Sequence, residues 1–471
     1  MRDTRLIPRH GGYRKLKSFQ VAQLAYGVMG GEKQLLISCC FAYLGMLYPV
    51  HASAQSAAID TSVAHQYFRE AQKYSDRDGG KLWGRSLYGP MLFVDPATHS
   101  VVANQNDLQG QLTKKDEIYV GRLPDKQPVA NFATTWAGIK WTMIVWPLIP
   151  KDDFQRVGLM LHESFHRIQS DLGLAPSNPS NDHLDSLDGR IWLQLEWSAL
   201  RKALTSGGSG RREAAEDALT FRNHRRALFP NSESSERALE MNEGLAQYTG
   251  YKLSAGSDTE LIDRLAKQID DAAKRPTFVR SFAYVSGPVY GALLDASGAK
   301  WRQGLSDSDD LGSLLQTSMK IKLSGNLRAR AETEAAKYGR VALEAMENER
   351  ELARRKRIAE YKDRLVDGHT LLIPLADKGN FSFDPNNLIP LDSAGTVYPT
   401  ATIKDDWGAL EVSNGALLIR EGGRVRKIFV SIPADVNARP LKGNGWTLEL
   451  TAGWKLTPGQ REGDLVLTSS R

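Results

Sequence analysis

The segment GLMLHESFHRIQS (158–170) constrains the fold most, because it sets two histidines four residues apart within an apolar helical pattern. A helix turns by about 100° per residue, so His162 and His166 lie about 40° apart, and Glu163 lies about 60° from His166 on the same side. An adjoining apolar stripe consists of Phe154, Val157, Leu161, Phe165, Ile168 and Leu172. Because an unpaired imidazole is costly to bury, the pattern predicts a helix over 153–172 whose two histidines bind one metal ion.

The alternative is that these are two ordinary histidines on a buried helix face. A third metal ligand elsewhere in the sequence would favour the metal site over this alternative. A catalytic zinc needs a third protein ligand and an open position for water. The metzincin continuation is absent, because Gln169 stands where glycine is required and Leu172 where a third histidine would stand. The inverted motif H-x-x-E-H is absent as well. The only cysteines, Cys39 and Cys40, lie in an N-terminal apolar run that we expect to be removed, so a carboxylate is the expected third ligand.

A second motif, LEMNEGLAQYTG (239–250), resembles the N-E-G-x-A stretch of gluzincin metallopeptidases. In that family an H-E-x-x-H helix is followed by a second helix that donates a glutamate to zinc. The resemblance implies a zincin-like catalytic fold with Glu243 as the third ligand, and it places Asn242 and Gly244 near the metal. The 76 residues between His166 and Glu243 exceed the interval in thermolysin-like and aminopeptidase patterns. The N-terminus-recognition motif of gluzincin aminopeptidases is not visible.

Glu196, on an aromatic-rich predicted helix, is the alternative third ligand. Its carboxylate could instead pair with Arg190 or Arg201. Glycine at position 244 permits the close approach of another backbone or of a ligand. This favours Glu243 over Glu196.

Other residues are candidates for supporting roles. Gluzincins commonly place a Tyr or His donor opposite the metal, so the resemblance implies that Tyr284 or Tyr290 stabilises the oxyanion. Either could equally be a core tyrosine with a satisfied hydroxyl. Asp185 and Asp188 are candidates for orienting a ligand histidine, although solvated loop carboxylates are commoner. His183 is expected in a loop.

These residues together predict an exported zinc metallopeptidase that acts on a peptide or protein substrate. Zinc bound by His162, His166 and Glu243 would activate a water molecule, and Glu163 would take its proton and deliver it to the leaving amine. One alternative is a zinc-dependent hydrolase of a non-peptide amide or ester. Another is a non-catalytic exported metal-binding protein, against which Glu163 argues, because a structural site needs no base.

Residues 1–54 are predicted to be an export signal. The continuous apolar run over 35–50 follows Lys33 and precedes Ala52-Ser53-Ala54, a small-x-small cleavage pattern. We expect cleavage after Ala54 and a periplasmic or secreted location in a bacterium. An uncleaved anchor is the alternative, and it would be the only contact with a membrane.

The distribution of charge argues against a nucleic-acid partner. Residues 1–54 carry seven Lys or Arg against two acidic residues, which accounts for +5 of the formal net charge of +6. The remaining chain is therefore nearly neutral and lacks the basic footprint of a nucleic-acid-binding protein.

The chain as a whole is expected to be an α+β protein. The predicted parts are a β-rich N-terminal part of the catalytic domain (55–150), a helical zinc-binding part (151–326), a charged helical linker (327–366) and an all-β domain (367–471). Helices are predicted over 153–172, 186–204, 211–227, 235–253, 259–274 and 286–297. The apolar strand WTMIVWPLI (141–149) is a candidate sheet edge for binding an extended peptide, although a buried core strand is commoner for so apolar a run.

Overall fold

A computed structural model describes residues 58–376, 379–384, 387–422 and 424–470. The predicted export segment, 1–54, lies outside these residues. Within the described ranges, no helix combines the length and apolar character needed to cross a membrane. The fold mixes α and β structure and ends in a small all-β part.

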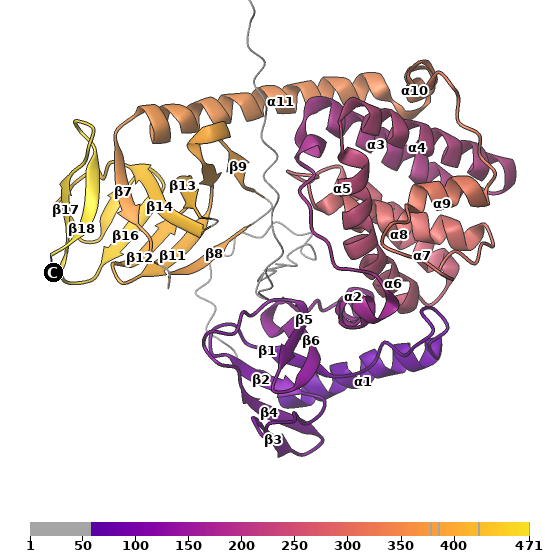
Figure 1. Cartoon of the computed structure of the whole chain (residues 1–471), viewed down its shortest axis with the longest axis horizontal. Coiled ribbons are helices and arrows are strands. Elements are labelled where there is room, and N and C mark those ends of the chain that lie inside the picture. Colours follow the sequence, from indigo (N-terminus) through magenta and orange to yellow (C-terminus); the bar gives the residue numbers. More distant parts are fainter. Residues whose placement is uncertain (1–57, 377–378, 385–386, 423, 471) are drawn as a thin grey trace, which may run out of the picture. The chain divides into compact units, whose positions relative to one another are not determined.

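The N-terminal part contains a six-stranded sheet with the strand order β3-β4-β2-β1-β6-β5 (Figure 1). Strands β1 and β6 pair in parallel, and the other pairs are antiparallel. The elements are α1 (Thr61–Asp78), β1 (Met91–Val94), β2 (Ser100–Ala103), β3 (Leu112–Lys115), β4 (Ile118–Arg122), β5 (Phe132–Trp136) and β6 (Ile139–Val145).

Alternation along the strands sends side chains to two separate apolar clusters. Successive residues of a strand point to opposite faces. In β1, Met91 and Phe93 join the main core, whereas Leu92 and Val94 join a second cluster. Phe68 of α1 stacks on Phe93 at a ring-centroid distance of 4.5 Å. The main core therefore lies on the face of the sheet that α1 covers.

The prediction that residues 141–149 offer a free sheet edge is wrong. Most of this segment forms β6, which pairs with β1 on one side and β5 on the other. Interior strands of this kind read as continuous apolar runs because both faces are buried. Strand β5 lies at the end of the sheet and packs against helix α2.

The helical part follows the sheet and matches most of the predicted helices. Its elements are α2 (Asp153–Gln169), α3 (Leu187–Thr205), α4 (Gly208–Leu228), α5 (Ser232–Leu239), a π-helical turn (Glu240–Gly244), α6 (Leu245–Ser254), α7 (Asp258–Ala272), α8 (Ser281–Ala296) and α9 (Leu311–Ser318). Asp152 caps α2 by accepting a hydrogen bond from the Gln155 backbone N–H at 2.9 Å. The helix predicted over 235–253 is divided by the π-helical turn.

Helix α8 begins at Ser281, five residues before the predicted start, and it continues through Pro288. A proline inside a helix cannot donate to the carbonyl four residues earlier. Here the side-chain Nε2 of Gln268 donates to that carbonyl, which belongs to Tyr284, at 2.9 Å. The helix therefore tolerates the proline without leaving the Tyr284 carbonyl unsatisfied.

The charged segment forms two helices in place of one, α10 (Leu327–Ala335) and α11 (Arg340–Lys362). Gly339, at φ 75°, adopts the left-handed conformation between them. Glu347 and Tyr361 of α11 are buried, and Glu347 accepts hydrogen bonds from Arg190 Nε and Gln194 Nε2, each at 2.7 Å. Helix α11 is therefore tied to α3 by a buried ion pair.

The C-terminal part contains two sheets with the orders β17-β18-β7-β14-β13-β10-β9 and β15-β16-β12-β11-β8. The strands are β7 (Thr370–Pro374), β8 (Asn380–Phe383), β9 (Ile389–Pro390), β10 (Thr396–Tyr398), β11 (Ala401–Asp405), β12 (Gly408–Val412), β13 (Ala416–Glu421), β14 (Arg424–Ser431), β15 (Leu441–Gly443), β16 (Trp446–Leu450), β17 (Trp454–Pro458) and β18 (Leu465–Ser469). Residues from both sheets share one apolar core.

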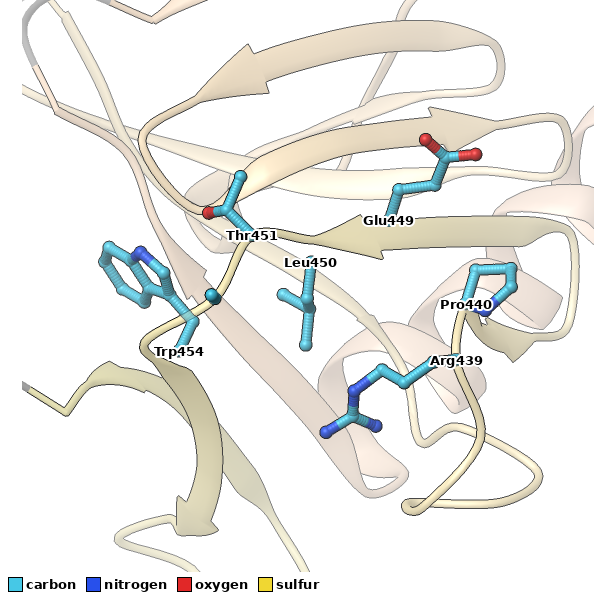
Figure 2. Close-up of a pocket in the computed structure, with 7 residues that line it drawn as sticks. Arg439, Pro440, Glu449, Leu450, Thr451 and Trp454 are labelled. Carbon is cyan, nitrogen blue, oxygen red and sulfur yellow. The ribbon is translucent and has the colours of Figure 1, made fainter.

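A shallow hollow of about 450 Å³ lies on this C-terminal part (Figure 2). Glu449 and Leu450 leave β16 in opposite directions, as consecutive strand residues do. Leu450 lies between the Trp454 ring and the Arg439 guanidinium. None of the predicted metal ligands lines this hollow.

Candidate metal centre

His162, His166 and Glu243 come together as a group that can hold a metal ion. Their ligand atoms all lie within 4.8 Å of one another. The two Nε2 atoms are 3.2 Å apart, and Glu243 Oε2 lies 3.5 Å from His162 Nε2 and 3.4 Å from His166 Nε2. Two histidine nitrogens and a carboxylate oxygen therefore converge on one point.

The two histidines share one face of α2, whereas Glu243 belongs to the π-helical turn between α5 and α6. Helix α6 packs tightly on α2, because a Cβ added at Gly250 would lie only 2.4 Å from the Gly158 carbonyl oxygen. The π-helical turn in turn meets α8 backbone to backbone. A Cβ at Gly287 would lie 2.3 Å from Gly244 Cα. Single π-helical turns are rare in proteins, but those that occur are often found at functional sites. Here the close glycine contacts bring the π-helical turn near α2, so that Glu243 reaches the two histidines.

Two glutamines orient the histidines. His162 Nδ1 lies 3.0 Å from Gln247 Oε1, and His166 Nδ1 lies 2.8 Å from Gln169 Oε1. If each Nδ1 carries the proton and donates to its glutamine, each Nε2 presents its lone pair to the metal position. The sequence offered only weak signals for these partners: Gln169 stands three residues after His166, and Gln247 one turn after Glu243.

Gln169 also links the two ligand segments. Its Nε2 donates to Asn242 Oδ1 at 3.0 Å, and Asn242 Nδ2 donates to Glu243 Oε1 at 3.3 Å. His166 and Glu243 are thus joined by a chain of two amide side chains. The resemblance implied only that Asn242 lies near the metal; its hydrogen-bond partners, Gln169 and Glu243, come from the structure.

The structure does not place Asp185 or Asp188 beside a ligand histidine. Asp185 Oδ1 accepts from the Phe278 backbone N–H at 2.8 Å and from Arg190 Nη1 at 3.3 Å. Asp188 is exposed at the start of α3. The histidines are oriented instead by the amide side chains of Gln169 in α2 and Gln247 in α6.

Of the two candidate tyrosines, the structure brings only Tyr284 to the site. Its hydroxyl donates to Glu243 Oε2 at 2.6 Å, and its ring stacks on His162 at 5.7 Å with an interplanar angle of 3°. The Tyr290 hydroxyl donates instead to Glu196 Oε1 at 2.7 Å. Six residues along a helix correspond to a rotation of about 240°, so the two tyrosines cannot face the same point.

Glu196 belongs to a separate buried ion network. Its carboxylate pairs with Arg222 at 3.3 Å and, at shorter range, with Arg225. The expected partners are engaged elsewhere, Arg190 with Glu347 and Arg201 with Asp270. His183 also belongs to this network, because its Nε2 lies 2.8 Å from Glu236 Oε1. Glu196 is therefore not among the ligand atoms that converge with His162 and His166.

Electrostatics couple the metal-ligand residues tightly. Burial alone lowers the pKa of His166, but the hydrogen bond and charge of Glu243, together with the charge of Glu163, raise it to about 9. Burial alone raises the pKa of Glu243, but His162 and His166 hold it well below its usual range. In the metal-free protein a neutral solution therefore leaves Glu243 ionised and His166 protonated, and a metal ion bound here would displace that proton.

The stability of the metal-free protein is expected to fall as pH rises. The folded pKa of His166, about 9, exceeds its ordinary value of 6.5. Its contribution is therefore fully present below pH 6.5 and is lost as pH rises through 9. The loss is at most about 3 kcal/mol. Urea unfolding in EDTA across this pH range measures it, and His166→Gln is expected to flatten the curve. An equally steep curve for that variant would contradict the assignment.

The residues around the metal position differ in their access to solvent. Glu163 and Glu243 are fully buried, and His162 and Tyr284 are nearly so. The side chain of His166 keeps 13% of its exposure, and that of Arg280, which lies 3.6 Å from Glu243 Oε1, keeps 25%. The partly exposed side of the site is therefore the side of His166 and Arg280.

Comparison with known proteins finds no matching family model, no matching curated protein and no matching solved structure.

Proposed function

We propose that this chain is a zinc-dependent peptide hydrolase with a zincin-like catalytic domain of the gluzincin type. The proposal rests on the separation of the three ligand atoms. Zinc binds histidine nitrogen at about 2.0–2.1 Å and carboxylate oxygen at about 2.0–2.2 Å in tetrahedral geometry, so its ligand atoms are roughly 3.3–3.6 Å apart. The observed separations of 3.2, 3.4 and 3.5 Å agree with this geometry.

The composition of the site supports a catalytic role over a structural one. Structural zinc sites use four protein ligands, commonly with cysteine, whereas catalytic sites use three and keep one position open. Three ligands converge here, and His166 is partly exposed. Glu163 adds a buried carboxylate one residue after a ligand. A site that only held the fold together would not need this second acidic group.

Zinc bound in this position would lower the pKa of a water molecule and polarise the substrate carbonyl. Glu163 takes a proton from the attacking water and gives it to the amine nitrogen as the C–N bond breaks. The hydroxyl group thereby ends on the acyl carbon and the proton on the leaving amine. We assign the oxyanion hydrogen bond to Tyr284, because its hydroxyl already donates to Glu243 Oε2 at the site.

Strand β5 is one of the two edge strands of the six-stranded sheet, and we propose it as the edge along which an extended substrate binds. It lies at the end of the six-stranded sheet and packs against α2, the helix that carries both histidines. An edge strand presents unpaired backbone groups to which a peptide can add. We therefore propose that the substrate backbone binds along β5 (Phe132–Trp136), and not along the segment 141–149 that the sequence suggested.

Elemental analysis of the purified full-length protein tests the proposal directly. After loading with zinc and gel filtration, about one zinc ion per chain is expected. Glu243→Ala is expected to lose it, because two histidines alone bind zinc weakly, and the wild-type protein is expected to cleave members of a peptide library. A wild-type protein without zinc would contradict the hydrolase. Zinc that survives in Glu243→Ala would contradict the ligand assignment and return attention to Glu196.

A further inference from the structure

Arg280 is the charged residue at the partly exposed side of the metal centre. It immediately precedes α8, four residues before Tyr284. Its Nη1 donates to Asn178 Oδ1, and its Nη2 lies 3.6 Å from Glu243 Oε1. The Nη2 group is buried, yet it has no hydrogen-bond acceptor among the described residues. Asn178 thus holds the guanidinium from one side while the other side faces the metal ligands with unused donor capacity.

A bound divalent ion would change what this guanidinium meets. Histidines that bind a metal ion are neutral. The positive charges of the divalent ion and Arg280 would therefore exceed the negative charges of Glu163 and Glu243 by one. Glu243 would also be engaged by the ion. An arginine beside an excess of positive charge favours an anionic ligand, and its planar fork matches the two oxygens of a carboxylate.

We propose that Arg280 binds a substrate carboxylate, so that the site selects peptides carrying a carboxylate close to the scissile bond. This specificity rests on the proposed peptide hydrolase. The carboxylate is either the C-terminus of the substrate or an acidic side chain, because both present the same two oxygens to the guanidinium.

The test measures binding without turnover. Full-length Glu163→Gln protein is loaded with zinc and immobilised, and three pools of acetylated hexapeptides randomised at the same positions are passed over it. Peptides of the first pool end in a carboxylate. Peptides of the second pool end in an amide and lack Asp and Glu. Peptides of the third pool end in an amide and contain Asp or Glu. Mass spectrometry of the retained peptides is expected to find about 10- to 100-fold tighter binding in the first or third pool than in the second. The preferred pool identifies the source of the carboxylate.

The same selection with Arg280→Gln added is expected to reduce the preference to within about twofold. Arg328→Gln serves as the matched control, because that arginine is 79% exposed on α10, and it should keep the preference. Zinc content is measured in every variant, so that loss of metal is distinguished from loss of peptide binding. Equal retention of all pools, retention of none, or a preference that survives Arg280→Gln would overturn the inference. Cleavage of unselected peptides by wild-type protein would leave the proposed hydrolase standing even then.

Discussion

Glu163→Gln is expected to lower kcat/KM for peptide hydrolysis by about 10²–10⁴-fold while the protein keeps its zinc. Glutamine has nearly the size of glutamate, so the fully buried position remains filled. It cannot accept the proton of the attacking water, and it is not one of the three residues whose ligand atoms converge. Activity on a cleavable library peptide and zinc content are measured on the same preparations.

Glu213→Gln is the matched control, because it makes the same change of charge on a side chain that is 58% exposed. Its activity and its zinc content should equal those of the wild-type protein. Full activity in Glu163→Gln would remove this residue from the proposed chemistry. Loss of zinc from Glu163→Gln would instead make Glu163 a ligand and contradict its role as the base.

Gly287→Ala is expected to destabilise the protein by about 3 kcal/mol or more and to abolish zinc binding. The added Cβ would lie 2.3 Å from Gly244 Cα, a backbone atom of the turn that carries Glu243. Helix α8 and the π-helical turn must move apart to accommodate it. Glu243 would then leave the two histidines, and Tyr284 would move with α8. Urea unfolding and elemental analysis measure the two effects.

Gly210→Ala provides the comparison within another helix. The nearest atom to its added Cβ is Ser206 Cβ at 3.7 Å, an ordinary contact. Alanine is a better helix former than glycine by about 1 kcal/mol, so this variant should be as stable as the wild-type protein or slightly more stable. If Gly287→Ala behaved like Gly210→Ala and kept its zinc, the close contact of α8 with the π-helical turn would not be what positions Glu243.

Local sequence patterns predicted much of the helical part. Helix α2 follows from its apolar periodicity, and two acidic residues, Asp152 and Asp153, stand where a cap is needed; the structure uses Asp152. The prediction failed at the start of α8, which begins at Ser281 and not at residue 286. The donation from Gln268 to the Tyr284 carbonyl compensates for Pro288, and α7 supplies that side chain only once the chain has folded.

The sequence by itself determined that His162, Glu163 and His166 share one side of a helix, because their spacing alone fixes their angles. It also narrowed the third ligand to two carboxylates. The tertiary structure decided between them: the packing of α6 on α2 and of Gly244 on Gly287 brings Glu243 to the histidines, whereas Arg222 and Arg225 hold Glu196 elsewhere. The choice of Tyr284 over Tyr290, the glutamine partners of the histidines and the interior position of β6 were settled in the same way. All of these depend on which elements meet, and contacts between distant segments leave no periodic trace in the sequence.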